Sequence, residues 1–75
     1  MTAARRQLLN AWTSRNIDWE KGRTTSPSPS DYLYDADHIF AAHINTDVRE
    51  AFYEAWDAGK SNLELADLLI ERMSS

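Results

Sequence analysis

Residues 45–70 carry the strongest structural signal in this chain and read NTDVREAFYEAWDAGKSNLELADLLI. On both sides of Gly59, apolar residues recur every three or four positions, which is the spacing of one helical face. Gly59 itself is the left-handed residue that commonly follows the last turn of a helix. Ser61 and Glu64 then form the pattern of a capping box, which opens a new helix. The stretch therefore predicts two helices, over 47–58 and 62–73, that pack as an αα-corner.

A third helix is predicted just upstream of this pair. Ser28 is followed by Pro29 and Asp31, which is the order of an N-cap, a first helical proline and an acidic third residue. We expect this helix over 29–43. Its apolar stripe consists of Leu33, Ala36, Phe40 and Ile44, widened by Tyr32, Ile39 and a partly packed His43.

The N-terminal segment predicts a fourth, shorter helix. Ala4, Leu8 and Trp12 recur four residues apart, so a helix is expected over 3–14. No stretch of the chain alternates polar and apolar residues with period two, so no strand is predicted. The expected fold class is all-α, a small bundle of about four helices.

All 75 residues are expected to form a single domain, because a chain this short cannot build two cores. A stretch rich in Ser, Thr and Pro over 22–30 predicts a linker loop. It separates an N-terminal helix and arm, over 1–21, from a helical body over 31–75. Ile17 and Trp19 share one side only in an extended chain, which favours an irregular arm after the first helix.

The composition excludes several classes of protein. The absence of cysteine rules out disulfides and thiolate metal sites. The chain is 43% hydrophobic, which is ordinary for a folded protein, yet no apolar run is long enough to span a membrane. No secretory signal is visible either. These features predict a cytoplasmic protein that makes no contact with membranes.

Charge is distributed unevenly along the chain. Residues 1–30 hold five basic and two acidic residues, a net +3, whereas residues 31–75 carry a net −7. The acids of the last two helices are three or four residues apart, so each set forms one stripe on a polar face. The two acidic stripes are Asp47, Glu50, Glu54 and Asp57, then Glu64, Asp67 and Glu71. We hypothesise an anionic surface that binds a basic partner, with simple solvation as the alternative.

Four apolar residues are candidates for contact with a target or with a second copy of the chain. They are Trp19, Tyr53, Leu63 and Leu68. Leu63 and Leu68 lie off the apolar stripe of the last helix, so both would be exposed in a monomer. A homodimer is therefore one expectation.

The segment 51–70 resembles the first half of a helix-turn-helix, with a glycine-containing turn, a capping serine and an Ala-x-x-Leu pattern. The resemblance implies a dimeric DNA-binding or transcription accessory protein, in which Arg5, Arg6 and Arg15 would contact phosphate. Only five residues follow the segment, however, so no recognition helix is expected. The exposed positions are also acidic, whereas duplex binding needs cations that meet phosphates. Direct binding of nucleic acid is therefore the alternative function.

No pattern of catalytic or metal-binding residues stands out. There is no cysteine nucleophile and no Gly-x-Ser-x-Gly elbow, and the two glycines are isolated. Asp35 and His38 have the spacing of a carboxylate–histidine pair, but a helical metal site needs such pairs from two helices. We expect no enzyme activity, no cofactor and no metal.

Taken together, these features predict a small acidic regulator that acts by binding another protein. We expect it to inhibit its target by occupying a basic surface, such as one that otherwise binds nucleic acid. Phage-encoded inhibitors of host machinery share this size and charge, which is an analogy and not a shared motif.

Overall fold

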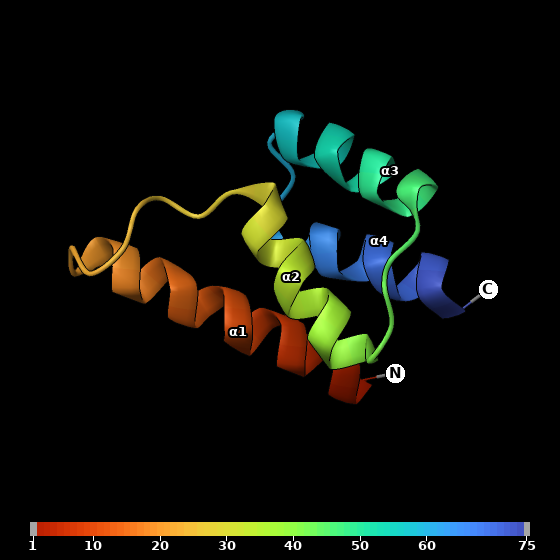
Figure 1. Cartoon of the computed structure of the whole chain (residues 1–75), viewed down its shortest axis with the longest axis horizontal. Helices are drawn as coiled ribbons and strands as arrows, with labels where there is room; N and C mark the ends of the chain where they lie inside the picture. Colours follow the sequence, from red (N-terminus) through yellow and green to blue (C-terminus); the bar gives the residue numbers. More distant parts are fainter. Residues whose placement is uncertain (1, 75) are drawn as a thin grey trace.

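The computed structural model describes residues 2–74, and this part of the chain forms four helices (Figure 1). The helices are α1 (Thr2–Glu20), α2 (Pro29–Phe40), α3 (Thr46–Asp57) and α4 (Asn62–Ser74). No strand occurs within the described residues, so the predicted all-α bundle is confirmed. All four helices contribute buried side chains to one hydrophobic core.

The helices pack as neighbours around this core. α4 contacts α1 on one side and α3 on the other, and α2 also contacts both α1 and α3. Figure 1 shows α3 and α4 as consecutive helices that run in opposite directions and are joined by a short turn. This arrangement leaves the outer faces of α3 and α4 next to each other on the surface.

The predicted helix starts are confirmed by their hydrogen bonds. The Ser28 hydroxyl accepts from the Asp31 N–H at 3.3 Å, and the Asp31 carboxylate accepts from the Ser28 N–H at 3.0 Å. Ser61 and Glu64 make the same reciprocal pair at the start of α4. The side chain of Asn45 caps α3 by accepting an N–H from its first turn. These bonds satisfy backbone donors that helix ends otherwise leave unpaired.

The first helix is longer than the sequence predicted. The expected helix over 3–14 and the irregular arm are replaced by one helix that continues to Glu20 and stops at Gly22, whose φ is 77°. The N–H groups of Gly22 and Arg23 close this end with the two bonds of a Schellman motif. Residues 15–21 contain no helix breaker, and the apolar periodicity used for the prediction could not detect a helix that continues on polar residues.

The second helix is shorter than the predicted 29–43. It ends at Phe40 because Ala41 adopts a left-handed conformation, with φ 53° and ψ 38°. Ile44 is fully buried, but it enters the core from the loop between α2 and α3. His43, which was expected to be partly packed, has a side chain that is 81% exposed. The prediction failed here because alanine is not a residue that signals a helix end.

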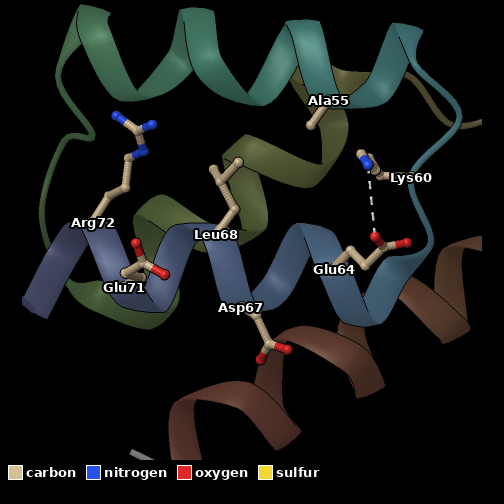
Figure 2. Close-up of a pocket in the computed structure, with 7 residues that line it drawn as sticks. All are labelled: Ala55, Lys60, Glu64, Asp67, Leu68, Glu71 and Arg72. Carbon is tan, nitrogen blue, oxygen red and sulfur yellow. Dashed lines mark ion pairs between the residues drawn. The ribbon is translucent and has the colours of Figure 1, made fainter.

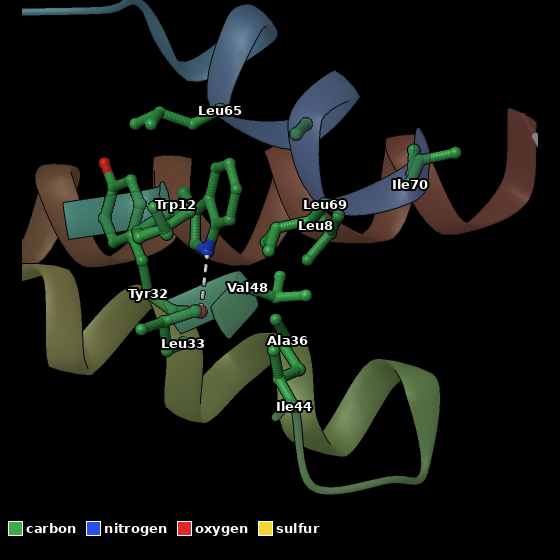
Figure 3. Close-up of a cluster of buried hydrophobic side chains, with 12 residues drawn as sticks. Leu8, Trp12, Tyr32, Leu33, Ala36, Ile44, Val48, Leu65, Leu69 and Ile70 are labelled. Atoms are coloured by element: carbon green, nitrogen blue, oxygen red, sulfur yellow. Dashed lines mark hydrogen bonds between the residues drawn. The ribbon is translucent and has the colours of Figure 1, made fainter. Parts of the chain in front are cut away.

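Tyr32 is buried in the core beside Trp12 (Figure 3). Its ring stacks on Trp12, with centroids 4.4 Å apart, and meets Trp56 edge-on at 4.8 Å. Its hydroxyl accepts from the Asn16 amide at 2.7 Å and donates to the Asn62 carbonyl oxygen at 3.3 Å. The Trp12 indole N–H donates to the Tyr32 backbone carbonyl at 3.2 Å. Tyr32, on α2, therefore contacts each of the other three helices.

We expect Tyr32→Phe to lower the free energy of unfolding by about 1–3 kcal/mol, because the hydroxyl bonds are lost and the ring stacking is kept. Urea denaturation followed by tryptophan fluorescence measures the change. Tyr34→Phe is the matched control, since the Tyr34 side chain is 59% exposed, and its effect should stay within about 0.5 kcal/mol. Equal effects of the two substitutions would contradict a central role for Tyr32.

A second prediction concerns the left-handed alanine. Ala41→Gly should raise the free energy of unfolding by about 1 kcal/mol, because glycine adopts this conformation without a Cβ clash. Ala42→Gly is the control: Ala42 is exposed and does not have a positive φ, so glycine should only lower stability there. Thermal unfolding compares the two variants with the wild type, and a lower midpoint for Ala41→Gly would refute the prediction.

Candidate protein-binding surface

All the predicted acidic residues are exposed on α3 and α4. They are Asp47, Glu50, Glu54, Asp57, Glu64, Asp67 and Glu71. The opposite face of each helix is buried: Val48 and Phe52 on α3, and Leu65 and Leu69 on α4, belong to the core. Burial of the apolar faces thus directs the acidic stripes toward solvent, as the helical spacing predicted.

Two of these acids have a basic partner. Arg5 of α1 donates from Nε to the Asp67 carboxylate at 2.8 Å, and Lys60 lies 3.8 Å from the Glu64 carboxylate. The Ser61 N–H and hydroxyl also donate to Glu64 and, with the charge of Lys60, lower the pKa of that carboxyl. The other acids make no ion pair with any residue between 2 and 74: Asp47, Glu50, Glu54, Asp57 and Glu71.

A groove with a volume of about 340 Å³ lies between α3 and α4 (Figure 2). Figure 2 shows Leu68 pointing from α4 toward α3, whereas Asp67 points away toward α1. Ala55 faces Leu68 from α3, and both side chains are half-buried against the core. The groove is lined by Ala55, Lys60, Glu64, Asp67, Leu68, Glu71 and Arg72. It has an apolar floor and charged walls.

A second hollow of about 350 Å³ adjoins the first. The two hollows share Glu71 and Arg72, and the second is completed by Asn45, Asp47 and Val48. We call these two hollows together the α3–α4 groove. Four of the seven predicted acids line it: Asp47, Glu64, Asp67 and Glu71. Glu50, Glu54 and Asp57 are exposed on α3 but do not line it.

Three of the four apolar candidates lie outside the α3–α4 groove. Trp19, Tyr53 and Leu63 are 46%, 38% and 50% exposed, respectively, and none of them lines the α3–α4 groove. Leu68 does line it, but it is half-buried against the core, which corrects the expectation that it would be exposed. Leu63 and Leu68 are five residues apart, or about 140° around α4, so they lie on different sides of the helix.

The arginines of α1 are largely engaged within the chain. Arg15 donates two hydrogen bonds to the Asp35 carboxylate, at 2.6 and 2.9 Å, and this hydrogen bonding raises the pKa of Arg15. Arg5 is paired with Asp67, as described above. Arg6 is exposed and has no ion pair with the described residues. The positive N-terminal segment is therefore a packed helix that neutralises part of the acidic body.

A polar network between α2 and α3 was not predicted. The Asp37 carboxylate accepts from the Ile44 N–H at 3.0 Å and from Arg49 Nη2 at 2.6 Å. Arg49 Nε also donates to the Ile44 carbonyl at 2.7 Å. Partial burial acts to raise the pKa of Asp37, but the hydrogen bonds from Ile44 and Arg49 and the charge of Arg49 outweigh it and lower the pKa. No local motif signals this contact, because it joins residues on either side of a loop.

No family model, no curated protein and no solved structure matches this chain. Among the residues the structure describes, no group of three or more His, Asp or Glu side chains is placed to hold a metal ion. Asp35 and His38, which have the spacing of a carboxylate–histidine pair, have separate partners: Asp35 accepts hydrogen bonds from Arg15, and His38 packs edge-on against Tyr34. None of the helices in residues 2–74 is long and apolar enough to cross a membrane.

The Asp37 network generates a pH prediction. We expect Asp37→Asn to lower the free energy of unfolding at pH 7 by about 1–3 kcal/mol, because Arg49 loses its charged partner. Since the pKa of Asp37 is lowered in the folded state, its contribution is present above the unfolded pKa of about 3.9 and is lost as pH falls through the folded pKa.

The difference in the free energy of unfolding between wild type and Asp37→Asn should therefore shrink on acidification from pH 7 to below the folded pKa of Asp37. Urea denaturation across this range measures it. Asp57→Asn is the control, because Asp57 is exposed and has no ion pair with the described residues. A difference in the free energy of unfolding that stays constant over the whole pH range would contradict a lowered pKa of Asp37.

Proposed function

We propose that this chain is a small acidic regulatory protein that binds a basic surface of another protein and thereby inhibits it, acting in the cytoplasm. The target surface is one that otherwise binds nucleic acid, so the protein acts as a competitive blocker. The analogy with a phage-type inhibitor of host machinery rests on small size and negative charge alone. The surface that we assign to this function is the pair of acidic stripes on α3 and α4.

The observation that carries this proposal is the set of five exposed acids without a basic partner among residues 2–74. Like charges three or four residues apart on a helix reduce its stability by a few tenths of a kcal/mol each. Apart from Asp47, which lies in the first turn of α3 where the helix dipole favours an acid, helix stability gives no reason to repeat acids along these faces. A concentrated negative surface does, however, steer and orient a positively charged partner, which raises the association rate.

The alternative function, a dimeric helix-turn-helix-like DNA-binding protein, receives less support from the same geometry. Two of the three arginines that would contact phosphate are held by carboxylates, Arg5 by Asp67 and Arg15 by Asp35. A duplex would have to break these pairs to gain phosphate contacts from Arg5 or Arg15, and Arg6 alone of the three would contact phosphate without that cost. The homodimer stays a prediction of the sequence, and light scattering tests it.

The test compares two charge reversals that change net charge equally. Glu54 lies on the α3 stripe and Glu20 on α1, and both are exposed. Wild type, Glu54→Lys and Glu20→Lys are immobilised and exposed to a cell lysate, and the retained proteins are identified by mass spectrometry. We expect basic nucleic-acid-binding proteins to be retained by wild type and Glu20→Lys, and to be reduced about tenfold by Glu54→Lys, since a bound cation would then be repelled.

Two further measurements decide between the functions. Added duplex DNA should release the retained proteins, because it competes for the same basic surface. Direct titration of the chain with duplex DNA should show no tight binding; tight binding that weakens steeply with salt would favour the DNA-binding alternative. If Glu54→Lys and Glu20→Lys retain the same proteins, the acidic stripe serves only solvation and the proposal is wrong.

A further inference from the structure

We propose that the α3–α4 groove receives a short amphipathic helix of the partner protein. An apolar side chain of that helix sits on Leu68 and Ala55, and a Lys or Arg side chain one turn away pairs with Asp47 and Glu71. This inference rests on the proposed function and specifies where, and by what pattern, the partner binds.

The apolar floor is the first argument. Leu68 and Ala55 face each other from α4 and α3, and each is only partly covered by the core. The hollow of about 340 Å³ above them is near the lower limit of about 300 Å³ for small-molecule pockets, which are mostly apolar. Here most of the lining residues are charged. A side chain projecting from another protein fits such a site better, as in the helix-in-groove mode of recognition.

Charge is the second argument, and it distinguishes the two ends of the groove. Near the start of α4, Glu64 is close to Lys60, and Asp67 is held by Arg5. At the other end, Asp47 from α3 and Glu71 from α4 line the same hollow without an ion pair to the described residues. Arg72 also lines this end, but it has an interaction of its own. Two carboxylates and one guanidinium line this end, so it carries a net negative charge and favours a cation from the partner.

Spacing is the third argument. Glu71 follows Leu68 by three residues, which is about 4.5 Å along a helix axis. A partner helix lying along the groove presents side chains three or four residues apart at a similar spacing and on one face. The matching pattern is an apolar residue and a basic residue separated by three or four positions. A separation of two positions would point the two side chains in different directions.

The test uses fluorescein-labelled peptides of about 15 residues, the length at which isolated helices begin to form. Each peptide has an Ala/Gln background with one Leu and one Arg, placed two, three or four positions apart, so composition and charge are identical. Fluorescence anisotropy measures binding to the full chain. We expect the peptides with spacing three or four to bind about tenfold more tightly than the peptide with spacing two.

Matched variants of the protein locate the site. Leu68→Ser should weaken binding about tenfold, whereas Leu63→Ser, on another side of α4, should not. Glu71→Lys should weaken it similarly, whereas Glu20→Lys, on α1 and outside the groove, should have little effect. Because Leu68 also packs against the core, Ala55→Arg serves as a second variant that fills the groove from α3. Circular dichroism and urea denaturation verify that each variant is folded.

Several outcomes would overturn the groove assignment. They are equal binding of all three peptides, no binding by any, or equal losses in Glu20→Lys and Glu71→Lys. Self-association of the chain that disappears in Leu68→Ser would make a second copy the occupant, which also overturns it. These results overturn the groove assignment alone. The proposed function is overturned only if Glu54→Lys and Glu20→Lys retain the same proteins from the lysate, so the two proposals can fail separately.

Discussion

The stacking of Tyr32 on Trp12 is the contact on which the rest of the structure depends. A chain of 75 residues buries a smaller fraction of its surface than a larger domain does, and no cysteine is present to cross-link it. Large aromatic rings compensate, because each removes about 150–250 Å² from water. Tyr32 adds two hydrogen bonds through its hydroxyl, to Asn16 of α1 and Asn62 of α4. Its ring also meets Trp56 of α3, so one side chain sets the positions of all four helices.

The second constraint is the connection between α2 and α3. Ala41 reverses the chain in a left-handed conformation, and Asp37 then holds the loop through the Ile44 N–H and Arg49. This network carries Ile44 into the core and fixes where α3 begins. The position of α3 beside α4 follows, and with it the groove between them. The candidate binding surface therefore depends on contacts between α2, the α2–α3 loop and α3.

Packing of the helices pairs some charged side chains with an opposite charge and leaves others without such a partner. The arginines of α1 reach across to carboxylates of other helices, Arg15 to Asp35 and Arg5 to Asp67. These pairs use two of the five positive charges of residues 1–30. The acids of α3 and the last turns of α4 gain no such partner among the described residues. The resulting negative surface is a consequence of helix packing as much as of composition.

The sequence by itself determined the helical class, the caps at Ser28 and Ser61, the stop at Gly59 and the exposure of the acidic stripes. These features depend on spacing within a few residues, and local backbone bonding and burial of one helix face decide them. Only the tertiary structure decided that α1 continues past residue 14 and that α2 ends at Ala41. It also decided which acids line the α3–α4 groove. Those outcomes depend on contacts between residues far apart in the chain, such as Arg5 with Asp67, which no local pattern encodes.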